Sequence, residues 1–243
     1  MTPHIYHVPV GETVQGVIDL TFLFLSGEKF GPTLGVISGV HGSDVSGIGG
    51  LQLFWEDMIK VQPKYMTGKI IVLPFANKLA LAQKSWGFKM GVGDADQNLN
   101  RQFPGNIQGE FGERITATIM RIFQEEGANL VIDLHTMNSR SIPFIIVDRI
   151  ECSAELKNKL WKYAKYFGLG VINDLPRETY EKSGLDGSST AAFLKAGISA
   201  FTVEVPGLDY ALPEAELVVR NGLWNMVRAM GIVGNGTDYL RWE

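Results

Sequence analysis

The sequence predicts a three-layer α/β/α sandwich built on a mixed, mostly parallel central sheet, with residues 1–243 forming one domain. Short apolar runs rich in β-branched residues alternate with longer segments of helical period, which is typical of an α/β fold. The runs are apolar throughout rather than alternating, as in strands that helices cover on both faces. The chain has 243 residues, of which 45% are hydrophobic and 20% charged, so it can bury one large core.

Five apolar runs are predicted as buried strands, and five other segments as helices. Gly, Pro or Asn lies near most of the junctions, where turns are expected. The predicted strands are, in order, Thr33–Val40, Lys69–Phe75, Asn129–Leu134, Ile142–Val147 and Ile198–Val205. The predicted helices are Val45–Lys60, Gly112–Glu126, Ala154–Phe167, Ser188–Ala196 and Pro213–Met230.

The segment Ala76–Gly112 interrupts this alternation and is predicted as a long loop. It is rich in Gly, Asn, Asp and Gln and carries two aromatic anchors, Trp86 and Phe103. Long loops inside compact domains are uncommon unless they serve a site. The segment is therefore a candidate for functional residues.

Charge and cysteine content exclude several classes of protein. Twenty-two Lys and Arg against 26 Asp and Glu give a net charge of −4 without long runs of one sign, which argues against nucleic-acid binding. The single cysteine, Cys152, cannot form an intrachain disulfide, which favours a reducing compartment. Neither a leader peptide at Met1–Val10 nor a membrane-spanning apolar stretch is recognised, so the expected location is the cytoplasm.

Two histidines follow predicted strands directly, whereas the nucleophile elbow, phosphate loop, dinucleotide fingerprint and HExxH motif are all absent. His41 follows the first predicted strand and His135 the third, at the strand ends where open α/β sheets bind ligands. Asp44, three residues after His41, can add a carboxylate oxygen. Two imidazoles and a carboxylate suit a catalytic zinc ion, although non-haem iron is also compatible.

Two further carboxylates lie near these histidines in the predicted sheet. Glu204 ends the last predicted strand, where it can act as a general base, and Asp133 can accept a hydrogen bond from a ligand imidazole. Each residue alone has a structural explanation: a loop histidine, a helix N-cap at Asp44, or a buried ion pair at Glu204. Their co-occurrence after separate apolar runs favours a metal site.

Five segments in this order resemble the succinylglutamate desuccinylase/aspartoacylase family of the zinc carboxypeptidase superfamily, from about Gly35 to Met230. GVHGSD at Gly39–Asp44 is similar to the family's GxHGxE ligand motif, and NLNRQFPG at Asn98–Gly105 is the most specific match. The other three segments are FGERI at Phe111–Ile115, DLHTMNSRSIPFI at Asp133–Ile145 and TVEVPG at Thr202–Gly207.

The resemblance implies one Zn²⁺ per chain, held by His41, Asp44 and His135, with Glu204 as general base. It also implies that Asn100 and Arg101 grip a substrate carboxylate, a task that suits the planar fork of arginine. Alternatively, Arg101 only fastens the long loop to the body of the protein.

The chain departs from the family pattern at three places. Asp44 stands where the family has Glu, which is one methylene longer. The family's Arg upstream of NLNR, which stabilises the oxyanion, has no counterpart near Gly91, Val92 and Gly93, and Lys89 is the nearest cation that can bind substrate instead. The residues after Glu204 suffice for one helix and a tail, which leaves no room for the family's small C-terminal β-domain.

These observations predict a zinc-dependent amidohydrolase that cleaves the amide bond of an N-acyl amino acid or a similar small carboxylate-bearing substrate. The expected partner is this small molecule, with no nucleic acid and no membrane, and homo-oligomer formation stays open. Two alternatives remain. One is a metallocarboxypeptidase acting on peptides, and the other is a ligand-binding module with weak or no catalysis.

Overall fold

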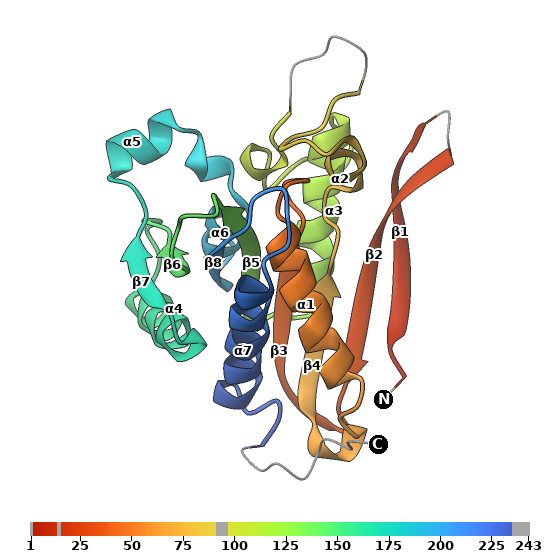
Figure 1. Cartoon of the computed structure of the whole chain (residues 1–243), viewed down its shortest axis with the longest axis vertical. Coiled ribbons are helices and arrows are strands. Elements are labelled where there is room, and N and C mark those ends of the chain that lie inside the picture. Colours follow the sequence, from red (N-terminus) through yellow and green to blue (C-terminus); the bar gives the residue numbers. More distant parts are fainter. Residues whose placement is uncertain (1, 14–15, 91–96, 235–243) are drawn as a thin grey trace.

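The computed structural model describes residues 2–13, 16–90 and 97–234. Eight strands form one sheet in the order β1-β2-β4-β3-β5-β8-β6-β7 (Figure 1). The central pairs β4/β3, β3/β5 and β5/β8 are parallel, as is β6/β7, whereas β1/β2, β2/β4 and β8/β6 are antiparallel. This confirms the predicted mixed, mostly parallel sheet. The strands are β1 His4–Thr13, β2 Gly16–Ser26, β3 Lys29–Ser38, β4 Thr67–Leu73, β5 Leu130–Met137, β6 Phe144–Val147, β7 Gly170–Asn173 and β8 Ser199–Pro206.

Helices cover both faces of the sheet, as the predicted three-layer sandwich requires. α1, α7 and α4 pack side by side on one face, while α3 and α6 lie on the other (Figure 1). Phe123 of α3 meets Phe193 of α6 edge to face, with ring centroids 5.8 Å apart. The helices are α1 Val45–Met58, α2 Lys78–Gln83, α3 Phe111–Glu125, α4 Ala154–Phe167, α5 Arg177–Lys182, α6 Ser189–Lys195 and α7 Pro213–Ala229.

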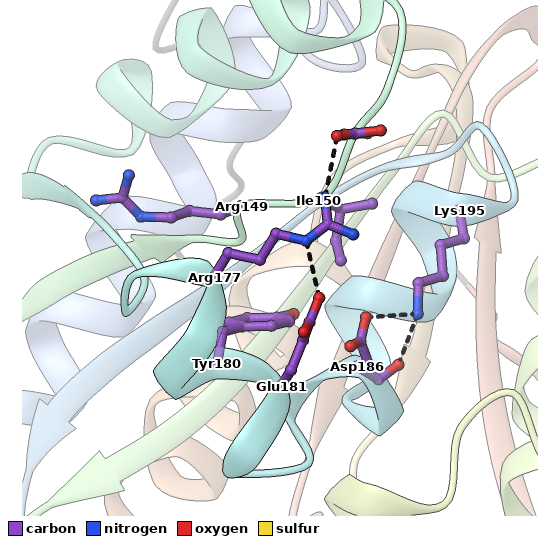
Figure 2. A pocket seen from close by; sticks show the side chains of 8 residues that line it. Arg149, Ile150, Arg177, Tyr180, Glu181, Asp186 and Lys195 are labelled. Atoms are coloured by element: carbon purple, nitrogen blue, oxygen red, sulfur yellow. Dashed lines mark hydrogen bonds and ion pairs between the residues drawn. The ribbon is translucent and has the colours of Figure 1, made fainter.

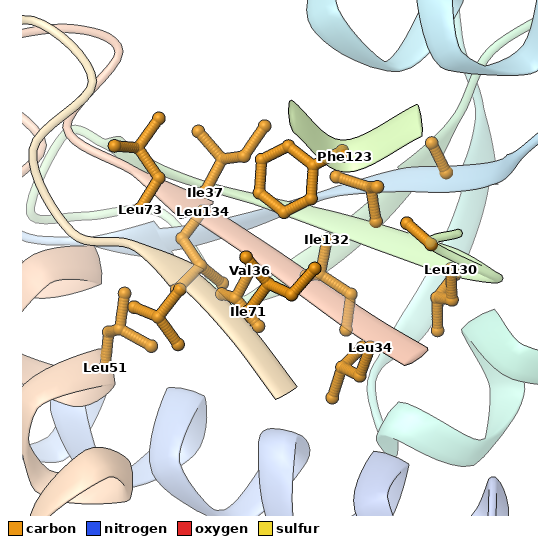
Figure 3. Close-up of a cluster of buried hydrophobic side chains, with 14 of the residues drawn as sticks. Leu34, Val36, Ile37, Leu51, Ile71, Leu73, Phe123, Leu130, Ile132 and Leu134 are labelled. Carbon is orange, nitrogen blue, oxygen red and sulfur yellow. The ribbon is translucent and has the colours of Figure 1, made fainter. Parts of the chain in front are cut away.

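The core fills both interfaces between the sheet and its helices. Figure 3 shows Leu51 of α1 on the same side of the sheet as Val36, and Phe123 of α3 on the other side. All three side chains are at most 1% exposed. Gly35 permits the close approach of α3, because a Cβ at this position would lie 2.6 Å from the Phe123 ring.

The N-terminal hairpin of β1 and β2 was not predicted. In β2, Leu20, Phe22 and Phe24 are buried and the residues between them are more exposed. This period of two marks a strand with one face in the core, whereas the prediction relied on runs that are apolar throughout. The four-residue β7 at the opposite edge was missed for a related reason, because its residues are only partly buried or exposed.

Two boundaries near the predicted site also differ from expectation. β3 ends at Ser38, so His41 lies in the loop that leads into α1. β5 continues to Met137, so His135 is inside the strand rather than after it. Within the segment predicted as a loop, Lys78–Gln83 forms α2 and Leu99–Arg101 forms a short 3₁₀ helix.

After β8 the described chain forms α7, and Val233 then makes an isolated antiparallel bridge with Met66. No strand follows β8 as far as residue 234, where the described part ends. Within the described ranges, no helix combines the length and the apolar composition needed to cross a membrane.

Candidate metal centre

Three side chains from separate parts of the chain converge beside the sheet. His41 comes from the β3–α1 loop, Asp44 directly precedes α1, and His135 comes from β5. Asp44 Oδ2 lies 3.2 Å from His41 Nδ1 and 3.1 Å from His135 Nδ1, and the two Nδ1 atoms are 3.2 Å apart. The three residues therefore form a group that could hold a metal ion.

The spacing of these three atoms fits a tetrahedral zinc ion. Zinc bonds of about 2.0–2.1 Å place neighbouring ligand atoms about 3.3 Å apart at the tetrahedral angle. Two nitrogens and one oxygen also leave a fourth position for water or substrate, as in catalytic zinc sites. The donor set and its dimensions are therefore compatible with zinc.

The outer nitrogen of each imidazole faces an oxygen, which fixes the inner nitrogen as the one that presents a lone pair. His41 Nε2 lies 3.1 Å from Asn98 Oδ1, and His135 Nε2 lies 3.0 Å from Asp133 Oδ2. A carboxylate or amide oxygen accepts, so each Nε2 carries the proton and each Nδ1 is free to bind a cation. Ser189 Oγ also donates to Asp133 Oδ2, which positions this fully buried carboxylate.

Asp44 occupies the N-cap position of α1 but its side chain does not cap the helix. Its Oδ1 instead accepts hydrogen bonds from Thr136 N at 3.0 Å and from Thr136 Oγ1 at 2.8 Å. These bonds direct Oδ2 toward the two histidines. The simple capping explanation for Asp44 is therefore wrong.

The pKa values of Asp44 and His135 depart from their usual ranges because of burial and neighbouring charges. Burial raises the pKa of Asp44, but His135 and His41 outweigh this effect and hold that pKa well below its usual range. Burial lowers the pKa of His135, but Asp133 and Asp44 outweigh it and raise that pKa well above its usual value. Metal binding to this group would therefore compete with protonation of His135.

Glu204 in β8 lies next to His135 in β5, because the two are Cα partners in the parallel ladder. Its side chain lines the same cavity as both histidines. Burial, with the nearby charges of Asp44 and Asp133, raises the pKa of Glu204 to about 7, against the lowering effect of His135. Its Oε2 is buried and makes no hydrogen bond within the described part of the chain.

Asn100 and Arg101 also line this cavity, which has a volume of about 230 Å³. Asn100 Oδ1 accepts from Ser189 N at 2.9 Å. Arg101 Nε donates to Ser183 O at 2.8 Å, and its Nη1 donates to Asn100 O at 2.7 Å. Arg101 thus fastens the loop to the backbone at Ser183 and is also one of the residues that line the cavity.

Lys89 is placed apart from this group. It is exposed, its backbone N and O bond the side chain of Gln83, and it is not among the residues that line the cavity. Its expected role in substrate binding therefore stays a prediction. Gly91, Val92 and Gly93, where the family's upstream Arg was sought, lie outside the described residues.

Several residues of the site were not foreseen. Trp86, expected only as an aromatic anchor of the loop, stacks on His41 with ring centroids 4.5 Å apart, and Asn98 and Thr136 hydrogen-bond the side chains of His41 and Asp44. Asp148 and Asp174 line the cavity as well. Asp148 follows the predicted strand Ile142–Val147, so the rule that found the histidines could also have found it.

A second cavity of about 170 Å³ lies by α5 and contains many charged side chains (Figure 2). Arg177 pairs with Glu151 and Glu181, and Lys195 pairs with Asp186. These side chains form separate ion pairs that largely neutralise one another, and among the described residues only His41, Asp44 and His135 form a group that could hold a metal ion.

A sequence profile of the succinylglutamate desuccinylase/aspartoacylase catalytic domain matches residues 30–229. The N-alpha-acetyl-L-2,4-diaminobutyric acid deacetylase of Halomonas elongata is 24% identical over 208 residues, which are 84% of this chain but only 56% of that relative. The chain thus spans little more than half the length of this relative.

Solved structures show the same fold. The succinylglutamate desuccinylase from Silicibacter sp. TM1040 superposes with a TM-score of 0.80 at 19% identity, over 97% of this chain and 68% of that one. A metallo-carboxypeptidase from Burkholderia cenocepacia superposes with a TM-score of 0.73 at 11% identity, over 94% of this chain and 65% of that one. From the profile match across most of its length, the chain belongs to the succinylglutamate desuccinylase/aspartoacylase catalytic domain family.

Proposed function

We propose that this chain is a zinc-dependent amidohydrolase that removes the acyl group from an N-acyl amino acid or a similar small carboxylate-bearing molecule. The observation that carries the proposal is the triangle of His41 Nδ1, Asp44 Oδ2 and His135 Nδ1, with sides of 3.1–3.2 Å, in one cavity with Glu204 and Arg101. The name of the Halomonas relative, a deacetylase of an N-acetylated amino acid, supports the same reaction class.

His41, Asp44 and His135 would hold the zinc ion. When bound, zinc lowers the pKa of a water molecule toward about 7 and polarises a carbonyl oxygen. Thr136 and Asp133 keep Asp44 and His135 in the orientation that metal binding needs. Trp86 stacks on His41 and limits rotation of its ring.

Glu204 would take a proton from the attacking water and deliver it to the departing amine. An amine leaves poorly unless it is protonated, so the same carboxyl group must first accept and then donate. The raised pKa of Glu204, about 7, places it between these two tasks at neutral pH.

Asn100 and Arg101 would bind the substrate carboxylate. Arg101 Nε and Nη1 are bound to backbone oxygens, which fixes the guanidinium plane and leaves Nη2 to meet the substrate. A held guanidinium is a stronger carboxylate partner than a mobile one, since less conformational entropy is lost on binding.

The first test is metal content and the variant Glu204→Gln. Purified wild-type protein should bind about one zinc per chain, and Glu204→Gln should keep this zinc while losing nearly all hydrolysis of N-acyl amino acids. Glu56→Gln on the exposed side of α1 is the matched control and should keep full activity. A fully active Glu204→Gln enzyme would exclude this residue as the base, and a protein that binds no zinc would exclude the metal mechanism.

A metallocarboxypeptidase is the second candidate, because the structure also superposes on such an enzyme. The same groups can hydrolyse a C-terminal peptide bond if the cavity admits a peptide. Comparing kcat/KM for short peptides and for acetylated, succinylated and other N-acyl amino acids separates the two. Faster cleavage of the peptides would favour the second candidate.

A further inference from the structure

Two carboxylates leave neighbouring strands at one wall of the cavity. Asp148 follows β6 and Asp174 follows β7, and Val147 pairs with Asn173 in the parallel β6/β7 ladder. Asp174 N also donates to Val147 O at 2.9 Å, which holds the two strand ends together. Both aspartates line the cavity that contains His41 and His135.

Only one of the two carboxylate oxygens of Asp148 accepts a hydrogen bond from the described residues. The residue is 7% exposed, and its Oδ1 accepts a hydrogen bond from Tyr180 Oη at 2.6 Å. Its Oδ2 is buried and has no hydrogen-bond partner in the described part of the chain. A buried carboxylate oxygen without a donor is costly, so such groups usually serve a ligand or a proton.

Asp148 is mainly charged at neutral pH. Burial raises the pKa of Asp148 to about 6, and the like charge of Asp174 adds to this, against the lowering effects of the nearby Thr190 and Tyr180 hydroxyls. Burial and the charge of Asp148 raise the pKa of Tyr180 far above its usual value, so Tyr180 remains a donor. The cavity wall therefore carries a negative charge with an unused acceptor.

Arg101 does not neutralise this charge by direct contact. Its Nε and Nη1 donate to the backbone oxygens of Ser183 and Asn100, and no ion pair joins it to Asp148 or Asp174 within the described residues. Arg101 is also the only lysine or arginine among the described residues that line this cavity. Burial lowers the pKa of Arg101, whereas the charges of Asp174 and Asp148 act to raise it, so Arg101 is their counter-charge at longer range. A substrate carboxylate bound to Arg101 would compete with the two aspartates for this positive charge.

We propose that Asp148 and Asp174 form a subsite for a cationic group of the substrate, namely a protonated amine on the side chain of the amino acid whose carboxylate Arg101 binds. This inference rests on the proposed function and narrows it. The substrate is then an N-acylated diamino acid, with its amide at the metal site, its carboxylate on Arg101 and its free ammonium on the aspartates. A neutral side chain of equal length leaves the charge of Asp148 unmatched.

The test compares two substrates that differ only in this charge. Nα-acetylornithine ends in an ammonium group, and Nα-acetylnorleucine has a methyl group in its place. The wild-type enzyme should have a kcat/KM at least about tenfold higher for the ornithine derivative, as expected for a charge-assisted hydrogen bond. Asp148→Asn, which keeps an oxygen acceptor for Tyr180, should remove this preference, mainly through KM.

Three further variants separate recognition from structure. Asp174→Asn should reduce the preference, while Tyr180→Phe should largely keep it, because the phenol only positions Asp148. Asp186→Asn, which removes a carboxylate paired with Lys195 in the neighbouring cavity, is the matched control and should leave the preference unchanged (Figure 2). A preference that survives in folded Asp148→Asn and Asp174→Asn, checked by circular dichroism, would overturn the subsite.

Binding measurements keep the subsite and the proposed reaction apart. Isothermal titration of zinc-loaded Glu204→Gln with ornithine and norleucine derivatives reports recognition without hydrolysis. The subsite is supported if the ornithine derivative binds more tightly than the norleucine derivative and if Asp148→Asn abolishes this difference. This holds even if the wild-type enzyme hydrolyses neither compound, a result that would refute only the proposed amidohydrolase activity. Hydrolysis of both compounds at equal kcat/KM, or no binding of either, overturns the subsite.

Discussion

Asp133→Asn tests how the protein prepares His135 for metal binding. Asp133 is fully buried, and its Oδ2 lies 3.0 Å from His135 Nε2 and also accepts from Ser189 Oγ. A hydrogen bond to a charged group contributes about 1.5–3 kcal/mol. Since about 1.4 kcal/mol corresponds to a factor of ten, the neutral amide should weaken zinc binding by about 10- to 100-fold.

The effect of Asp133→Asn should depend on pH. Asp133 should stabilise metal-bound His135, but it should also stabilise the protonated imidazole that would compete with the metal, because burial lowers the pKa of His135 and the charge of Asp133 acts to raise it. At low pH these two effects partly cancel, because the metal must first displace a proton. The ratio of wild-type to variant zinc affinity should therefore grow as the pH rises from 6 to 9.

The assay is competition for zinc with a chromophoric chelator, measured at several pH values. Asp19→Asn in β2 is the matched control, because Asp19 pairs with Lys78 and is not part of the metal group. Its zinc affinity should equal that of the wild type. Equal affinities of wild type and Asp133→Asn at pH 9, or a ratio that falls with pH, would refute the proposed role of the carboxylate.

Three other measurements follow from the structure. Arg101→Lys should raise KM about tenfold or more with a smaller change in kcat, because a mobile ammonium group replaces a planar guanidinium that hydrogen bonds to backbone oxygens hold in place. An unchanged KM would contradict this. The value of kcat/KM should fall at acid pH with an apparent pKa at or below about 7, because Glu204 must be ionised to act as a base and bound zinc can only lower the pKa of Glu204. If Glu204→Asp is active, its kcat/KM should show the same fall at acid pH. Gly35→Ala should lower the free energy of unfolding by about 1–3 kcal/mol in urea denaturation, because the new methyl would lie 2.6 Å from the Phe123 ring, and full stability would show that α3 can move away.

Much of the metal group could be predicted from local sequence signals. His41 and His135 each follow an apolar run, and in parallel strands such positions meet at one edge of the sheet. Two errors did not matter, because the end of β3 at Ser38 and the extension of β5 through His135 still leave both imidazoles at that edge. The role of Asp44 is less local, since a helix N-cap and a ligand carboxylate look the same in sequence.

The residues that hold the ligands could not be assigned from sequence. Asn98 is 57 positions from His41, and Ser189 is 56 positions from Asp133, yet each pair is hydrogen-bonded. Lys89 illustrates the opposite case, because its closeness in sequence to the NLNR segment made it a candidate although its side chain is exposed and outside the cavity lining.

The sequence by itself determined the layered α/β fold and the order along the chain of the segments that form the central strands. It also identified the candidate site residues at positions 41, 44, 135 and 204, because hydrophobic period and strand-end position are local properties. The tertiary structure decided which nitrogen of each imidazole faces inward, that Asp44 turns to Thr136 instead of capping its helix, and that Asp148 shares the cavity with Arg101. These features depend on contacts between residues far apart in the chain, and burial then sets the charge of each group by removing water around it.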